Sequence, residues 1–264
     1  MRGVRSSLRS LALVLARALG NDWSLPHWRV LCFHDVPPEA AGRFEEYVSW
    51  FGRYYEWVSF SAGCAAVREG PLTHPIATLR FDDGWLSQGT VVLPILRRMR
   101  IPACLFVVPE YVNRGTMFRN RAGGHAMTWC MVKEWLAAGL ELGNHTFSHM
   151  RLSECDSDTI WREVAKANDE IFDRTEYRCV HFAYPHGRWS PRSREIIRSM
   201  GLISQSTIVR GPMRKGHPLE ALRADQCDLS RDPRRSELVM RAAEWAPWLR
   251  RIGALVARLQ RICL

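Results

Sequence analysis

The stretch IATLRFDDGW, residues 76–85, joins an apolar run to two adjacent carboxylates, Asp82 and Asp83. Charged groups at the end of a buried strand are unfavourable unless something binds them. One carboxylate could hold a metal ion while its neighbour accepts a proton. An Asp-Gly pair is also common in turns, and the aspartates alone favour that simpler interpretation.

A second stretch, LGNHTFSHMRLS, carries His145 and His149 four residues apart. If this stretch is helical, both imidazoles lie on one face and can share an ion. Neutral imidazole is a common ligand of zinc-like metals. With Asp83, the two histidines would make a three-ligand site with open positions, which is typical of a catalytic metal. Asp82 would then be a base placed beside a ligand.

Two further stretches carry polar residues after apolar runs. In CVHFAYPHGRWS, a tight turn at 184–187 could direct backbone N–H groups toward a developing oxyanion, or could simply join a strand to a helix. In RVLCFHDVPP, His34 could protonate a leaving amine. The alternative is a partly buried His34 that is held by Asp35.

Elements of two kinds must position these residues. Short apolar runs predict strands at 29–34, 76–82, 102–108, 139–144, 179–184 and 202–208. Helical patterns predict helices at 42–56, 60–69, 88–100, 130–138, 155–174, 190–200 and 235–262. This alternation predicts an α/β fold with a mainly parallel sheet, whose active site lies at the carboxyl ends of the strands.

Composition narrows the class of protein. The chain has 264 residues, and 47% hydrophobic residues argue against disorder. A formal charge of +10 suits anionic partners or a merely soluble surface, and no nucleic-acid-binding motif is visible. The eight cysteines form no CxxC pair, and we expect free thiols in a reducing compartment.

Three segments are expected along the chain: a basic N-terminal segment at 1–25, a catalytic domain at 26–234 and an amphipathic basic helix at 235–264. Only seven residues separate Arg9 from Arg17, which is short for a signal peptide, so export is the lesser alternative. The last segment is expected to pack on the domain or to lie on an anionic membrane, with a kink at Pro247.

In this order, the motifs RFDDGW, NHTFSH and FAYPHG resemble those of the polysaccharide deacetylases, the carbohydrate esterase family 4 with the NodB-homology domain. The resemblance covers about 29–225. It implies a distorted, incomplete (β/α) barrel of about seven strands. It also implies one divalent metal ion, zinc in the first place and cobalt, nickel or iron as alternatives, and hydrolysis of acetamides on N-acetyl sugars or of acetyl esters.

The resemblance also implies roles for single residues. Asp82 would be the general base, and the backbone N–H of His186 would donate to the oxyanion. The metal ligands would be Asp83, His145 and His149. The segment VLCFHDV is similar to one in a permuted subgroup that acts on surface polysaccharides, where the early histidine, here His34, is the general acid. The substrate would contact Trp85, Tyr184 and Pro185.

The third motif departs from the family pattern. Many relatives have an arginine before the proline that tethers the catalytic aspartate, whereas this chain has FAYP. We expect Arg223, in EALRADQ, to supply that tether to Asp82. His186 stands where tyrosine is usual, so its side chain is expected to alter contacts with the substrate.

These observations predict a metal-dependent deacetylase of an N-acetyl sugar in bacterial surface polysaccharide biosynthesis, such as O-antigen or capsule synthesis. The substrate would be nucleotide- or lipid-linked, and the enzyme cytoplasmic, with peripheral contact to the inner membrane. The alternatives are a deformylase or an O-acetyl esterase on a related sugar, an inactive glycan-binding module, and a membrane-scaffold role for the arginine-rich termini.

Overall fold

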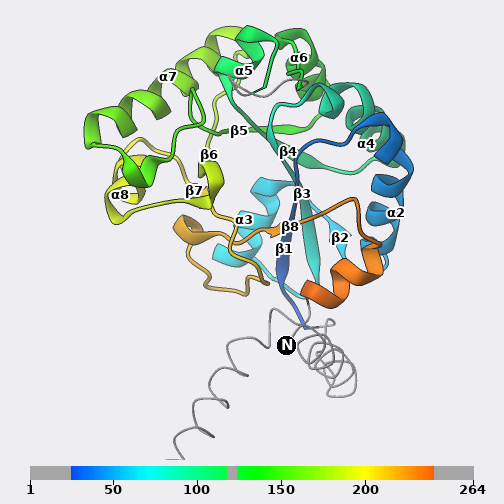
Figure 1. The fold of residues 1–264 in the computed structure, drawn as a ribbon. Coiled ribbons are helices and arrows are strands. Elements are labelled where there is room, and N and C mark those ends of the chain that lie inside the picture. Colours follow the sequence, from blue (N-terminus) through cyan, green and yellow to red (C-terminus); the bar gives the residue numbers. More distant parts are fainter. Residues whose placement is uncertain (1–24, 118–123, 241–264) are drawn as a thin grey trace, which may run out of the picture.

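The computed structural model describes residues 25–117 and 124–240 (Figure 1). The predicted N-terminal segment at 1–25 lies almost entirely outside these residues. Of the predicted C-terminal helix, residues 233–240 are helical and the remainder lies outside the described part. Within the described ranges, no helix combines the length and the hydropathy needed to cross a bilayer.

A curled parallel sheet forms the centre of the fold. Its strands are β1 (Trp28–Phe33), β2 (Glu56–Trp57), β3 (Ile76–Asp83), β4 (Ala103–Val107), β5 (Glu141–Asn144), β6 (His181–Ala183), β7 (Ser204–Ser206) and β8 (Asp225–Gln226). Seven of them follow the order β7-β6-β5-β4-β3-β1-β8, and β2 pairs with β3. All of these pairings are parallel. The predicted distorted, incomplete (β/α) barrel is therefore confirmed.

Helices surround the curl of the sheet (Figure 1). They are α2 (Ala41–Phe51), α3 (Phe60–Arg68), α4 (Leu93–Met99), α5 (Pro109–Arg114), α6 (Trp129–Ala137), α7 (Ser157–Thr175) and α8 (Pro191–Ser199), and a π-helical turn, η2 (Gln88–Val92), leads into α4. Side-chain oxygens accept hydrogen bonds from the first turns of four of these helices, and they belong to Ser59, Thr128, Asp156 and Ser190. Such caps explain where these helices begin.

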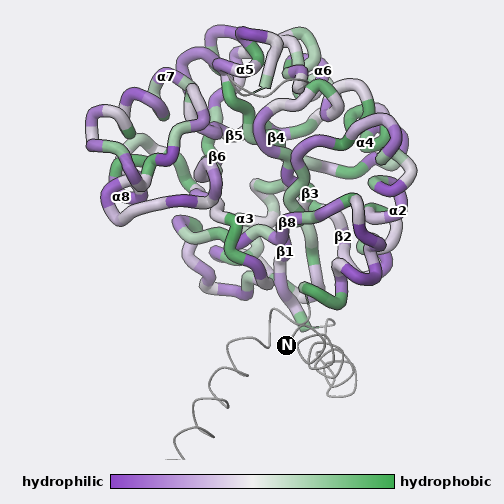
Figure 2. Tube along the Cα trace, in the orientation of Figure 1, coloured by the Kyte–Doolittle hydropathy of each residue, from purple (hydrophilic) through white to green (hydrophobic). Residues whose placement is uncertain are grey.

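The two faces of β1 contribute to two hydrophobic cores. Leu31 and Phe33 pack in the larger core, which also contains residues of α2, α4 and α6. Val30 and Cys32 point to the other face, into a core shared with α3. Figure 2 shows hydrophobic residues concentrated along the central strands and hydrophilic residues on the outer helices.

Helix α3 closes the end of the barrel opposite the strand ends that carry the predicted site. Its first backbone N–H group, that of Phe60, donates to the Glu141 carboxylate at 2.6 Å. Ser61 hydrogen-bonds His181 at 2.8 Å, so that α3 is joined to β5 and β6 at their amino ends. This arrangement leaves the carboxyl ends of the strands, where the predicted site lies, uncovered by α3.

Within the described residues, the predicted strands and helices agree with the structure to within a few residues, with two exceptions. The helix predicted at 42–56 ends at Phe51, and the one predicted at 88–100 begins as the π-helical turn. Most of the helix predicted at 235–262 lies outside the described residues. Among the strands and α-helices of the described residues, three short elements were not predicted: β2, β8 and α5. Each has only two to six residues, too few to show a periodic pattern. The cysteines of the described residues are free thiols, as expected, and Cys263 lies outside these residues.

A buried ion pair joins β1 to β8. Arg29 Nη1 donates to Asp225 Oδ2 at 2.6 Å, and neither side chain is exposed to solvent. Replacing Asp225 by alanine is expected to lower the free energy of unfolding by about 3–5 kcal/mol, because the Arg29 charge stays buried without its counter-ion. Urea denaturation measures this change, and Glu195→Ala in an exposed pair is the control. A loss below about 1 kcal/mol, typical of a surface pair, would contradict the prediction.

Candidate metal and catalytic site

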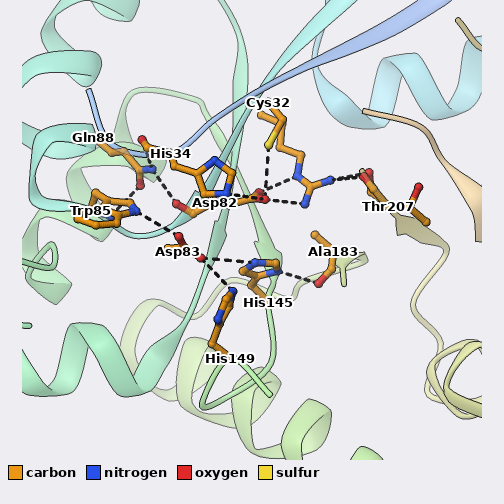
Figure 3. A network of polar contacts seen from close by, with 12 residues as sticks. Cys32, His34, Asp82, Asp83, Trp85, Gln88, His145, His149, Ala183 and Thr207 are labelled. Atoms are coloured by element: carbon orange, nitrogen blue, oxygen red, sulfur yellow. Dashed lines mark hydrogen bonds and ion pairs between the residues drawn. The ribbon is translucent and has the colours of Figure 1, made fainter. Parts of the chain in front are cut away.

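A hollow of about 800 Å³ opens at the carboxyl ends of the strands. It is bordered by six of the residues to which the sequence assigns catalytic or metal-binding roles: His34, Asp82, Asp83, His145, His149 and His186. His34 directly follows β1, both aspartates end β3, and the other histidines come from the loop after β5 and the turn after β6. Figure 3 shows most of these side chains converging on one another.

The backbone at the end of β3 allows both aspartates to face the hollow. Side chains alternate along a strand, so two neighbours would normally point to opposite faces. Asp83 has φ of 79°, and Gly84 follows with φ of 93°, which ends the alternation. Asp and Gly are among the residues that tolerate this left-handed conformation. Both carboxylates are almost fully buried.

Asp83, His145 and His149 form a group that could hold a metal ion. Asp83 Oδ1 lies 3.5 Å from His145 Nε2 and 3.3 Å from His149 Nε2. The same oxygen is buried and has no hydrogen-bond donor. A buried carboxylate oxygen without a donor is unfavourable, and a divalent cation between it and the two imidazoles would satisfy it. The donor set therefore fits a zinc-like metal.

Neighbouring groups orient these ligands. His145 Nδ1–H donates to the Ala183 carbonyl at 2.7 Å, which leaves Nε2 free for a metal. The indole N–H of Trp85 donates to Asp83 Oδ2 at 3.1 Å, so Oδ1 is the carboxylate oxygen that faces the imidazoles. Burial lowers the pKa of His145 to about 4, and burial together with His186 lowers the pKa of His149 to about 4. Both imidazoles are therefore neutral at physiological pH.

The two histidines converge through a loop and not through a helix, which corrects the expectation for this stretch. Residues 145–149 contain no helical turn, and Thr146 and His149 each have φ of 62°. Glu163 on α7 accepts from the backbone N–H of Ser148 at 2.9 Å and fixes the loop. The imidazole centroids are 5.0 Å apart, so the two rings lie close together as expected, although a loop and not a helix brings them there.

Arg80, and not Arg223, holds Asp82. Arg80 Nε and Nη2 donate to the two Asp82 carboxylate oxygens at 2.6 and 2.7 Å, from two residues earlier on the same strand. Arg223 has no contact with Asp82 among the described residues, and its guanidinium lies beside Gly211. The tether therefore comes from the first motif, because residues i and i+2 of a strand share a face.

The electrostatics of Asp82 follow from this pair. Burial alone would raise the pKa of Asp82, but the Arg80 charge, with smaller effects of His145 and His34, holds that pKa well below its ordinary range. Arg80 is itself anchored by hydrogen bonds to Ser206 Oγ and the Thr207 carbonyl, at 2.8 and 3.0 Å. Asp82 is thus held in place by Arg80 and is ionised at neutral pH.

His34 lies on the side of Asp82 away from the metal ligands (Figure 3). Its Nε2 is 4.0 Å from Asp82 Oδ2, and its side chain is 42% exposed, so it can meet a substrate. Asp35 does not hold the imidazole, since its carboxylate accepts from the Ser87 hydroxyl at 2.7 Å. Gln88 instead donates to the backbone carbonyls of both His34 and Asp82, at 3.0 and 2.7 Å.

The turn after β6 presents His186 at the hollow. His186 has φ of 57°, and the hydrogen bonds of the turn come from the N–H groups of Gly187 and Arg188, so they do not use that of His186. The centroids of the His186 and His149 rings are 4.6 Å apart. This geometry agrees with an oxyanion donor at His186 and with a side chain that contacts the site.

The three residues predicted to contact the substrate also have interactions within the protein. Trp85 holds Asp83, as described above. The hydroxyl of Tyr184 donates to Gln205, and its ring packs on Phe182 at 5.1 Å, although the residue borders the hollow. Pro185 is buried inside the turn. Contact of these three residues with a substrate stays a prediction.

The sequence analysis missed Arg80 and Gln88. The signal for Arg80 was its place two residues before Asp82, on the same face of a buried strand. No such signal identified Gln88, whose position depends on the unpredicted π-helical turn.

Comparisons with known proteins point to one family. A family model described as polysaccharide deacetylase matches residues 69–204. A chitooligosaccharide deacetylase of Sinorhizobium fredii is 31% identical over 118 residues, which are 44% of this chain and 49% of the relative. The peptidoglycan-N-acetylglucosamine deacetylase PgdA of Listeria monocytogenes is 28% identical over 116 residues, 44% of this chain and 22% of that protein. The chain spans about half the length of the chitooligosaccharide deacetylases that it matches.

Two solved structures share the fold. The Streptococcus pyogenes deacetylase PplD, in complex with acetate, superimposes with a TM-score of 0.71 at 19% identity, covering 81% of this chain and 98% of that one. IcaB from Ammonifex degensii has a TM-score of 0.69 at 23% identity, with 83% and 98% covered. The matched range contains β3 with both aspartates, the loop after β5 with His145 and His149, and the turn after β6 with His186. The chain belongs to the polysaccharide deacetylase family.

Proposed function

We propose that this protein is a metal-dependent hydrolase that removes an N-acetyl group from a sugar. The observation that carries the proposal is the pair of carboxylates at the end of β3. One is directed at two neutral imidazoles through an oxygen that lacks a donor, and the other is kept charged beside it by Arg80. Two adjacent carboxylates in such different surroundings suit two different roles.

The residues of the chain divide the chemical work between them. Asp83, His145 and His149 would hold the cation. A divalent cation there would polarise the acetyl carbonyl and acidify a water, which matters because Arg80 makes Asp82 a weak base. Asp82 would accept the proton of the attacking water, and the His186 N–H would donate to the developing oxyanion.

His34 would complete the reaction as general acid. It lies across Asp82 from the ligands and is open to solvent, where a departing sugar amine could receive a proton. The C–N bond of the amide breaks, the nitrogen takes the proton from His34, and acetate is the other product. The family relationship and the names of the matched relatives support an N-acetylated carbohydrate as the substrate.

Two observations test this proposal: which acyl group the protein releases, and whether that group was bound to nitrogen or to oxygen. Purified protein loaded with zinc, cobalt or nickel is incubated with N-acetylglucosamine oligomers, with N-formyl amino sugars and with O-acetylated sugars. We expect acetate from the N-acetyl oligomers to be the fastest product. Faster release of formate would instead favour the deformylase alternative, and faster cleavage of the esters an O-acetyl esterase. Binding of glycan without any turnover would favour the inactive module.

We propose more specifically that the substrate is a sugar linked through phosphate to a nucleotide or a lipid. Such a sugar would belong to the synthesis of a surface polysaccharide such as O-antigen or capsule. A second hollow of about 310 Å³ shares His34 and Gln226 with the site, and Arg210 and Arg231 also line it. Arg231 pairs with Asp228 at 2.9 Å, whereas Arg210 has no ion pair among the described residues. A phosphate on the departing sugar could therefore meet Arg210.

Replacing Arg210 by glutamate is expected to raise KM for an N-acetylglucosamine phosphate or nucleotide diphosphate about tenfold or more, through loss of one charge-assisted hydrogen bond and a new repulsion. KM for neutral chitooligosaccharides should hardly change. Lys133→Glu, a matched charge reversal on the exposed face of α6, is the control. Equal effects of Arg210→Glu on both substrate types would contradict the phosphate-linked substrate.

We also propose a cytoplasmic enzyme in peripheral contact with the anionic inner membrane. The free thiols and the basic sequence at both ends of the chain support this proposal. In fractionated cells, the protein should leave the membrane fraction in high salt or alkali. Recovery in the medium, or retention after both treatments, would contradict it.

A further inference from the structure

A second group of ligand-type side chains lies beside the first. Cys32 Sγ, His34 Nε2 and a carboxylate oxygen of Asp82 all lie within 4.8 Å of one another. Asp82 Oδ2 is 3.5 Å from the sulfur and 4.0 Å from the imidazole nitrogen. In Figure 3, Cys32 and His34 lie on one side of Asp82, and the Asp83 group lies on the other.

The register of the sheet explains why these side chains meet. Cys32 and His34 are two residues apart, so they leave β1 on the same face. The parallel register pairs Cys32 with Arg80 and Phe33 with Phe81, so His34 follows beside Asp82. Cys32 is fully buried and packs with Val30 in the core shared with α3. Its thiol also donates to Asp82 Oδ2, so the sulfur faces the carboxylate from within this core.

Thiolate, imidazole and carboxylate together are ligands that zinc prefers. With bonds of about 2.0–2.3 Å, ligand atoms around a tetrahedral zinc lie about 3–4 Å apart. The three atoms of this group are already near that spacing, and the partly exposed His34 has room to move closer. The fourth position would face the hollow and take a water.

We propose that Cys32, His34 and Asp82 form a second, inhibitory site for a thiophilic divalent cation such as Zn²⁺ or Cd²⁺. On binding, the sulfur–metal bond replaces the S–H bond, the proton goes to solvent, and His34 and Asp82 contribute lone pairs. The inhibition rests on the proposed function, because the same cation would occupy both the base and the general acid of the deacetylation. The site itself does not depend on that function.

The neighbouring charges set the order in which the two sites fill. Arg80 donates to both oxygens of Asp82, so a cation at the second site is repelled by a guanidinium that shares the same carboxylate. Asp83 has no such cationic partner among the described residues, and one of its oxygens has no donor. The Asp83 group should therefore bind first, and the Cys32 group only when metal is in excess.

Cobalt titration of the metal-free protein tests the site without any assay of activity. The first equivalent of Co²⁺ should bind oxygen and nitrogen ligands and give no sulfur-to-cobalt charge-transfer band. The second equivalent should produce that band in the wild type and in Cys130→Ser, a variant of an exposed thiol. Cys32→Ser and Cys32→Ala should lack it, with circular dichroism confirming that they are folded. Binding of only one equivalent, or a band that persists without Cys32, would overturn the proposal.

Zinc titration of acetate release tests the inhibition. The wild-type rate should rise up to one equivalent and then fall by about 100-fold or more, the factor that a general acid or base supplies. Relative to its own maximum, the rate of Cys32→Ser should not fall. Wild-type activity that is unaffected by excess zinc would refute the inhibitory role. If no variant releases acetate, the proposed function fails, while the cobalt titration still decides whether the second site exists.

Discussion

Replacing Arg80 by methionine is expected to lower acetate release at neutral pH by about 100-fold or more and to move the acid limb of the kcat/KM profile to higher pH. Arg80 is the main group that opposes the effect of burial on Asp82. Without it, burial raises the pKa of Asp82, so the carboxylate is protonated, and the base lost, at a higher pH than in the wild type. Removing one partner of this buried pair should also lower the free energy of unfolding by about 3–5 kcal/mol.

Two variants separate positioning from simple destabilisation. Arg80→Lys keeps the charge but cannot donate to both carboxylate oxygens. Compared with Arg80→Met, it should move the acid limb back toward the wild-type pH and restore only part of the rate of acetate release. Arg29→Met removes another buried arginine of the same sheet, whose partner is Asp225. It should lower stability without moving the acid limb. An acid limb that is the same in Arg80→Met and in the wild type would contradict the role of Arg80.

Replacing Asp83 by asparagine is expected to abolish tight metal binding and acetate release together. The asparagine oxygen can still accept from Trp85, so the fold of the strand end should persist. A cation present at about 1,000 times its Kd should stabilise the wild type by about 4 kcal/mol, and this stabilisation should be absent in the variant.

The metal-free proteins should show the opposite order of stability. In the wild type without metal, the charge at Asp83 Oδ1 is buried without a donor. The Asp83→Asn substitution removes that charge, so the metal-free variant should be at least as stable as the metal-free wild type. Thermal unfolding with metal and with chelator measures both effects. A variant that still gains several degrees on adding zinc would show that the cation is held elsewhere.

Much of the site follows from sequence because chemistry constrains it locally. Asp82, Asp83 and His34 directly follow or end apolar strands, and parallel strands bring their carboxyl ends to one edge. The ligand histidines were identified by type and spacing, although a loop fixed by Glu163 brings them together instead of a helix. Side-chain type was sufficient to select these histidines, whereas the backbone conformation expected for them was wrong.

The errors arose where tertiary packing decides a role. Arg223 was preferred as the tether because relatives place an arginine in a different motif, whereas Arg80 reaches Asp82 along its own strand. The hydrogen bonds from the Trp85 indole to Asp83 and from the Tyr184 hydroxyl to Gln205 likewise depend on the fold, and their contact with a substrate stays a prediction. Gln88 depends on a π-helical turn that no periodicity signals.

The most direct test of the central claim is acetate release from an N-acetylglucosamine oligomer as metal-free protein is titrated with zinc, with bound metal measured on the same samples. The rate should rise in proportion to bound metal up to one equivalent, and His145→Ala should neither bind that equivalent nor release acetate. A wild-type rate that is independent of bound metal, or one equivalent bound without any acetate released, would contradict the account.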